Sequence, residues 1–84
     1  MFEDTMRDIQ AEAERSAAKY GMFTSTHEAL GVLTEEYYEL IEAVRANDFA
    51  KIWKEAQQVS AVAARLADQS LQDERTPFAK RSGA

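Results

Sequence analysis

The sequence predicts an all-α protein. Apolar residues recur every three or four positions through most of the 84 residues, which is the spacing of one face of an α-helix. The chain holds one proline and three glycines, and its β-branched residues do not alternate as they do in half-buried strands. We therefore expect a three-helix chain with an antiparallel central helix hairpin, packing as a helical bundle in a homo-oligomer.

The first helix is expected at about residues 3–20. After an acidic first turn, its apolar face consists of Met6, Ile9, Ala13, Ala17 and Tyr20. Gly21 follows directly, and glycine is typical of the position just after a helix. A second helix is expected from Ser25 to about Ala46, because Ser25 followed three residues later by Glu28 is the pattern of a capping box.

The third helix is expected to begin after Asn47 and Asp48, whose side-chain oxygens can cap it. So short a connection usually folds consecutive helices back on each other, which brings the middles of the second and third helices together. One all-α domain is expected over residues 1–72. A flexible C-terminal tail is expected over residues 73–84, where Pro77 cannot continue a helix.

The composition restricts the kinds of partner that we expect this chain to bind. The formal charge of −5 argues against duplex nucleic acid, whose phosphates attract a basic face. No apolar run approaches the roughly 18 residues that a membrane span needs, so no membrane partner is expected. The chain has no cysteine, which fits a cytoplasmic location.

Two glutamates occupy unusual positions on their helices. Glu36 falls within the apolar arc of the second helix, and Glu55 falls within that of the third. A carboxylate that leaves water for an apolar seam loses solvation worth several kcal/mol, so it is tolerated only if it is protonated, paired or bound to a cation. Both positions therefore indicate a site rather than a solvated helix face.

Further oxygen donors lie within one turn of these two glutamates. Glu39 lies three residues after Glu36, and Gln58 lies three residues after Glu55, so each pair projects from one side of its helix. Carboxylates on facing helices, without histidine or cysteine, suit a hard ion such as Mg²⁺ or Mn²⁺. The alternative is a structural ion-pair network without metal, in which Lys51, Lys54 or Arg65 neutralises the cluster.

The same residues carry a family resemblance. The run Glu35-Glu36-Tyr37-Tyr38-Glu39 on one helix and Glu55-Ala56-Gln57-Gln58 on the next resemble the EExxE and ExxD motifs of MazG-like nucleotide pyrophosphohydrolases, which are all-α proteins. The resemblance extends over about residues 19–68. It implies Mg²⁺-dependent hydrolysis of a nucleoside triphosphate to a monophosphate and pyrophosphate, with sites formed between packed helices of an oligomer.

Carried over by position, the resemblance implies that Glu36, Glu39 and Glu55 bind metal and that Glu35 is a catalytic residue that orients the attacking water or binds metal. Gln58 departs from the pattern, because the family has an aspartate there. An amide oxygen can coordinate a hard cation but cannot neutralise it. The alternative function is therefore a non-catalytic nucleotide- or metal-binding regulator, or a helical oligomerisation module.

Substrate contacts and self-association are also expected. Tyr38 is a candidate to stack on a base, and the candidates for phosphate contacts are Lys51, Lys54 and Arg65. The third helix carries a second apolar stripe that includes Trp53 and Leu71. One partner helix cannot cover both stripes, so we expect a homodimer or a homotetramer.

Overall fold

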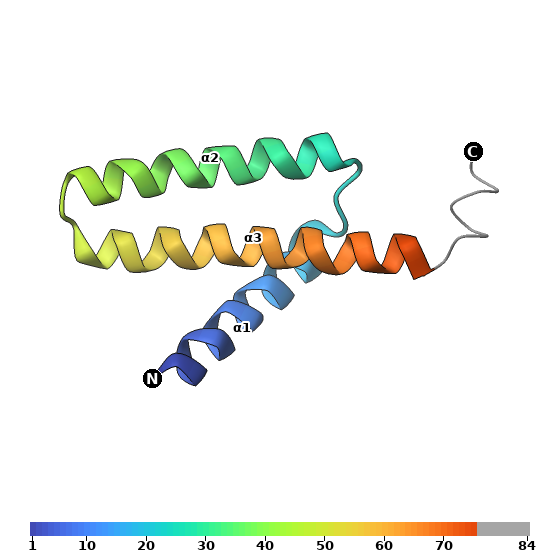
Figure 1. Ribbon diagram of the computed structural model, residues 1–84, viewed down its shortest axis with the longest axis horizontal. Coiled ribbons are helices and arrows are strands. Elements are labelled where there is room, and N and C mark those ends of the chain that lie inside the picture. The colour runs from blue at the N-terminus through green and yellow to red at the C-terminus, as the bar shows by residue number, and fades with distance from the viewer. Residues whose placement is uncertain (76–84) are drawn as a thin grey trace.

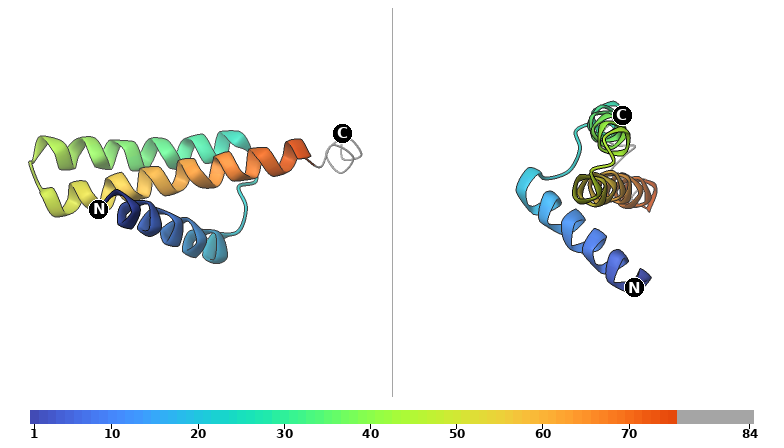
Figure 2. Two further views of the ribbon diagram at one scale, coloured as in Figure 1. Left: turned by 60° about the horizontal axis from the view of Figure 1, so that its bottom comes forward. Right: turned by 90° about the vertical axis from the view of Figure 1, so that its left-hand side faces the viewer.

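The computed structural model describes residues 1–75, with side chains described through residue 72. In this part of the chain there are three helices and no strand: α1 (Phe2–Tyr20), α2 (Thr26–Arg45) and α3 (Phe49–Arg75). Helix α3 is the central element, because α2 packs along one side of it and α1 crosses it on another (Figures 1 and 2). The predicted all-α class with three helices is confirmed.

Local sequence explains where α1 ends and α2 begins. Gly21 follows α1 with φ of 75°, a conformation that favours glycine, and its N–H donates to Ala17 O at 2.9 Å. The Ser25 side chain accepts a hydrogen bond from Glu28 N at 3.0 Å, as expected of an N-cap. The Glu28 carboxylate accepts from Thr24 N at 3.0 Å, one residue earlier than a standard capping box. Both sets of interactions hold the connection between α1 and α2 in place.

The turn between α2 and α3 follows from its own residues. Asn47 adopts φ of 53°, a left-handed conformation that asparagine tolerates better than most residues. Asp48 Oδ1 accepts from Lys51 N at 3.2 Å and so caps the first turn of α3. At its other end α3 continues to Arg75, past residue 72, where the all-α domain was expected to end.

Helix α3 extends to Arg75, the last residue that the structure describes. Residues 73–75 are helical, so the predicted tail begins no earlier than residue 76. The remainder of that prediction, residues 76–84, lies outside the described residues.

The apolar core is small and lies between α2 and α3. It is built on Phe23, Ala29 and Val62, with the partly buried side chains of Val32, Leu33 and Leu66 packed against them. Gln69 of α3 fixes the connection before α2, because its side chain accepts from Phe23 N and donates to Phe23 O, both at 2.9 Å. Within the described residues no large side chain is completely buried.

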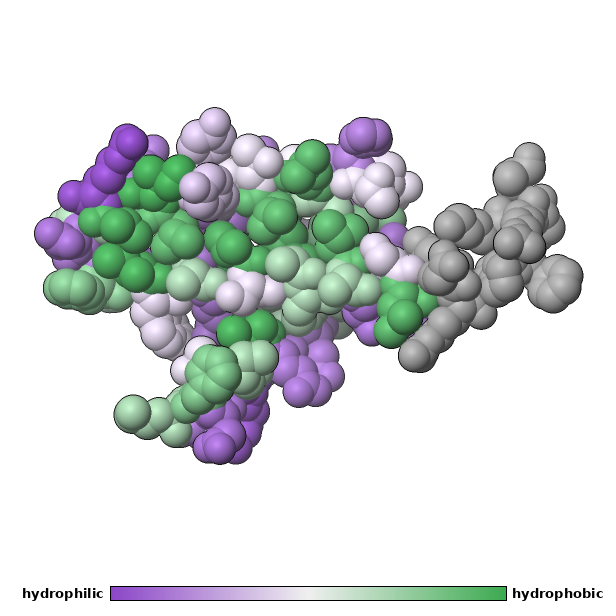
Figure 3. All heavy atoms as spheres, in the orientation of Figure 1, coloured by the Kyte–Doolittle hydropathy of each residue, from purple (hydrophilic) through white to green (hydrophobic). Residues whose placement is uncertain are grey.

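Much apolar surface remains exposed. Phe49 is 77% exposed and Trp53 is 60% exposed. Figure 3 shows apolar side chains spread over the face formed by α2 and α3. None of the helices in residues 1–75 combines the length and apolar character that crossing a bilayer requires.

Candidate metal centre

Three carboxylates meet across the contact between α2 and α3. Glu36 and Glu39 come from one side of α2, and Glu55 comes from α3. One carboxylate oxygen of each lies within 4.8 Å of the others. The structure therefore brings together three of the predicted ligands, and their separation is small enough for one cation to contact all three.

Glu55 is the most deeply placed member of this carboxylate cluster. Glu55 is only 9% exposed, and its Oε2 atom is buried without a hydrogen-bond partner. A buried carboxylate oxygen without a donor is costly, since it loses hydration and gains nothing in return. A bound cation would supply the missing partner.

Two carboxylates of the cluster have raised pKa values. Burial, followed by the negative charges of Glu39 and Glu55, raises the pKa of Glu36 from 4.5 to about 7. The side chain of Glu55 raises the pKa of Glu39, against a weaker opposing effect of Lys54. A divalent cation bound to the cluster would offset the charge repulsion that contributes to these shifts.

The predicted catalytic residue is not part of the cluster. Glu35 is exposed on α2 and does not share the oxygen arrangement of Glu36, Glu39 and Glu55. Tyr38 is also exposed, and its ring centroid lies 6.5 Å from that of Tyr37. Both side chains are open to solvent.

The three basic residues do not neutralise the cluster. Lys51 and Lys54 are exposed, and Lys54 acts on Glu39 only as a nearby charge. Arg65 donates to Gly21 O at 3.0 Å instead. Among residues 1–72 no ion pair involves a carboxylate of the cluster, so the described contacts do not support the alternative of an ion-pair network.

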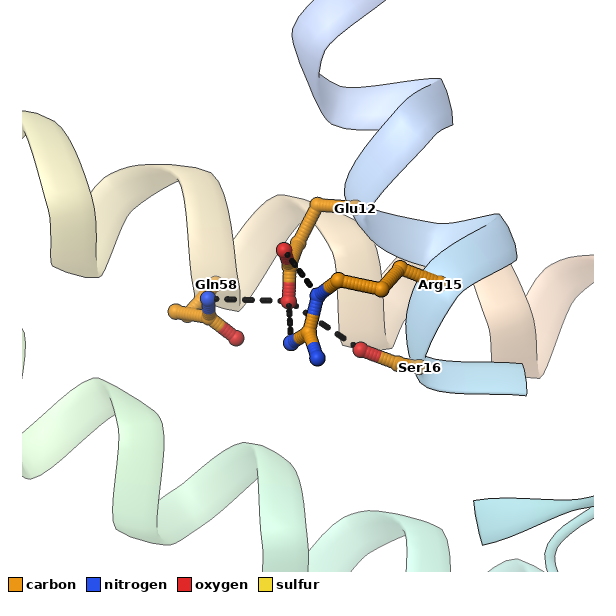
Figure 4. A network of polar contacts seen from close by, with 4 residues as sticks. All are labelled: Glu12, Arg15, Ser16 and Gln58. Atoms are coloured by element: carbon orange, nitrogen blue, oxygen red, sulfur yellow. Dashed lines mark hydrogen bonds and ion pairs between the residues drawn. The ribbon is translucent and has the colours of Figure 1, made fainter. Parts of the chain in front are cut away.

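The Gln58 side chain forms a hydrogen bond with Glu12, which was not among the predicted site residues. Its Nε2 donates to Glu12 Oε2 on α1 at 3.0 Å. Arg15 and Ser16 donate to the same carboxylate (Figure 4). Glu12 lies beside the apolar face of the first helix and not within it, so the argument that singled out Glu36 does not find it.

A cavity of about 500 Å³ adjoins the carboxylate cluster and this network. Its polar walls include Glu36, Gln58, Arg15 and Arg65. The Arg65 guanidinium lies 4.4 Å from the centre of the Phe23 ring, which also lines the cavity. The cavity thus has both acidic and basic residues in its walls. Its volume lies within the range of small-molecule sites.

Comparison of the chain with protein-family models, with curated proteins and with solved structures finds no match. The resemblance to MazG-like proteins therefore depends on the sequence motifs alone.

Proposed function

We propose that this chain is a Mg²⁺-dependent nucleoside triphosphate pyrophosphohydrolase of the MazG-like type. The observation that supports the proposal most strongly is the buried, unpartnered Oε2 of Glu55 beside the carboxylates of Glu36 and Glu39. In the proposed site, α2 and α3 act as an antiparallel hairpin that holds Mg²⁺ between them, with Mn²⁺ as a substitute. Carboxylates from two helices leave coordination positions for water and phosphate oxygens.

The proposed reaction transfers the α-phosphoryl group to water. The water oxygen forms a bond to the α-phosphorus, and the bond from this phosphorus to the bridging oxygen breaks, so that pyrophosphate leaves with the bonding electron pair. The attacking water gives up a proton to a base. Glu35 is proposed to orient this water from its exposed position on α2.

The cavity beside Glu36 is the proposed position of the nucleotide. Arg65 lines it, and Lys54 is close enough to influence Glu39, so both are proposed to contact phosphate oxygens together with Lys51. Tyr38 is proposed to stack on the base, since its ring is exposed and it directly precedes Glu39 on α2.

Self-association into a homodimer or homotetramer is part of the proposal. The small core and the exposed Phe49 and Trp53 support it, because large exposed apolar patches are rare on monomers. A molecular mass measured by light scattering over a range of protein concentrations tests this point. A monomer mass at every micromolar concentration would contradict it.

Turnover tests the proposed reaction. Purified full-length protein is incubated with a panel of nucleoside triphosphates, Mg²⁺ and inorganic pyrophosphatase, and phosphate release is measured against a control with EDTA. We expect Mg²⁺-dependent release that is lost in Glu36→Gln and Glu55→Gln. Glu42→Gln, which removes one exposed charge from α2, is expected to keep the wild-type rate. The absence of metal-dependent turnover in the wild type would refute the proposed reaction.

One observation favours a second function. Gln58 replaces the aspartate of the family motif, and its amide is bound by Glu12, so the site has one negative charge fewer than the family motif implies. A nucleotide- or metal-binding regulator, or a helical oligomerisation module, would need no turnover. Calorimetric titration with Mg²⁺ and a non-hydrolysable nucleotide distinguishes these cases, because a regulator binds without product formation and an oligomerisation module does not bind.

A further inference from the structure

Glu12 lies at the centre of a polar network that joins α1 to α3 (Figure 4). Its carboxylate accepts from Arg15 Nε at 2.9 Å and from a second guanidinium nitrogen of Arg15. It also accepts from Ser16 Oγ at 3.1 Å and from Gln58 Nε2 at 3.0 Å. Each of these groups donates to Glu12, and Arg15 also forms an ion pair with it, so the carboxylate serves here only as an acceptor.

The charge of Glu12 determines which way the Gln58 amide points. An ionised carboxylate only accepts hydrogen bonds, whereas an amide has a donor end and an acceptor end. The NH₂ end of Gln58 must therefore face Glu12, and the amide oxygen is turned toward α2 (Figure 4). Gln58 lines the same cavity as Glu36 and lies one helical turn after Glu55.

We propose that Glu12 is a positioning residue for the cation site, because it fixes the Gln58 amide with its oxygen directed to the carboxylate cluster as a further oxygen ligand. This inference rests on the proposed function, since it needs a cation at Glu36, Glu39 and Glu55. Arg15 and Ser16 hold the Glu12 carboxylate in place from α1. Helix α1 thereby contributes to the site although none of its residues contacts the cation.

The physical effect is preorganisation. A free amide can turn either end toward a cation, and the NH₂ end repels it. Fixing the amide before binding removes the unproductive orientation and the loss of side-chain freedom that binding would otherwise require. Residues that orient metal ligands in this way typically contribute about 10- to 100-fold to metal affinity.

The test is an isothermal titration calorimetry experiment, in which Mn²⁺ is added to the EDTA-treated 84-residue chain. Glu12→Gln leaves an amide at position 12 that can both donate and accept, so Gln58 no longer has a fixed orientation. We expect affinity to fall about tenfold. Glu14→Gln makes the same charge change at an exposed position of α1 and is expected to bind like the wild type.

A double variant separates positioning from a general effect on folding. In Glu12→Gln combined with Gln58→Glu, the amide at position 12 can donate to the carboxylate at position 58, and the second carboxylate oxygen is available to the cation. We expect this variant to recover at least the wild-type affinity. Circular dichroism in urea measures the folded fraction of every variant, so that affinities are compared at equal folding.

The outcomes distinguish this inference from the proposed function. If wild-type protein binds Mn²⁺ through Glu36 and Glu55, but Glu12→Gln binds as tightly as Glu14→Gln, the positioning role is wrong and the metal site stands. If the double variant stays as weak as Glu12→Gln, the positioning role is also wrong. If the wild type binds no Mn²⁺, the proposed metal site and the positioning role fail together.

Discussion

Replacing Glu36 by glutamine is expected to stabilise the metal-free protein above neutral pH while removing its cation binding. Burial and the neighbouring Glu39 and Glu55 raise the pKa of Glu36 from 4.5 to about 7. A raised pKa means that the folded state holds this proton more tightly than the unfolded state. Glu36 therefore contributes stability that is fully present below about pH 4.5 and is lost as the pH rises through about 7.

The size of this loss follows from the same pKa values. At about 1.36 kcal/mol per pH unit, a pKa that rises from 4.5 to about 7 corresponds to roughly 3 kcal/mol. Glu36 is only half-buried, so water screens part of the interaction, and a loss of roughly 1–2 kcal/mol is the better expectation. The uncharged glutamine keeps the shape of the side chain and removes this loss.

Urea unfolding, followed by far-ultraviolet circular dichroism between about pH 4 and pH 8.5, measures the effect. Protein concentration is held constant, because self-association would make stability depend on it. We expect the unfolding free energy of the wild type in EDTA to fall with rising pH and that of Glu36→Gln to fall less, because Glu39 still lies beside Glu55 in the variant. Added Mg²⁺ is expected to stabilise the wild type above neutral pH but not the variant.

Glu42→Gln is the control for this experiment, because it removes one exposed charge from the same helix. It is expected to keep the pH dependence of the wild type. The reasoning is refuted if the wild type shows no loss of stability between about pH 5 and pH 8, or if Glu36→Gln follows the same curve as Glu42→Gln.

Three further expectations follow from the structure. The affinity of the wild type for Mn²⁺ should rise up to tenfold per pH unit below about pH 7 and level off above it, because the cation competes with the proton on Glu36; a pH-independent affinity in calorimetry would contradict this. Gln69→Ala should lower the unfolding free energy by about 1–3 kcal/mol, because both backbone groups of Phe23 lose a partner, and unchanged urea unfolding would show that these bonds do not hold the connection. Ser25→Ala should cost about 1 kcal/mol through loss of the α2 cap, whereas Ser70→Ala at an exposed position of α3 should cost much less in the same assay.

The helix ends were predictable because local interactions determine them. Gly21 supplies the left-handed conformation after α1, and Ser25 and Asp48 accept hydrogen bonds from backbone groups three residues later. Each interaction joins positions that are close in the sequence, so residue type and spacing are sufficient to identify it. The helical state of residues 73–75 was missed because the apolar periodicity ends before them.

The carboxylate cluster was predictable for a related reason. Glu36 and Glu39 are neighbours on one helical turn, and the short connection to α3 restricts where Glu55 can lie. The position of an acid within an apolar arc already signals an unusual environment. The sequence could not give the mutual distance of the oxygens or the unpartnered state of Glu55 Oε2, because these depend on how closely the helices pack.

By itself, the sequence determined the helical class, the main helix boundaries and the inward position of Glu36 and Glu55, since all of these follow from helical period and local capping. Only the tertiary structure decided that α1 crosses α3 and that Glu12 binds Gln58 across 46 positions of sequence. The physical reason is that helical period determines which residues share a face, whereas the choice of the helix that this face meets depends on packing over the whole chain.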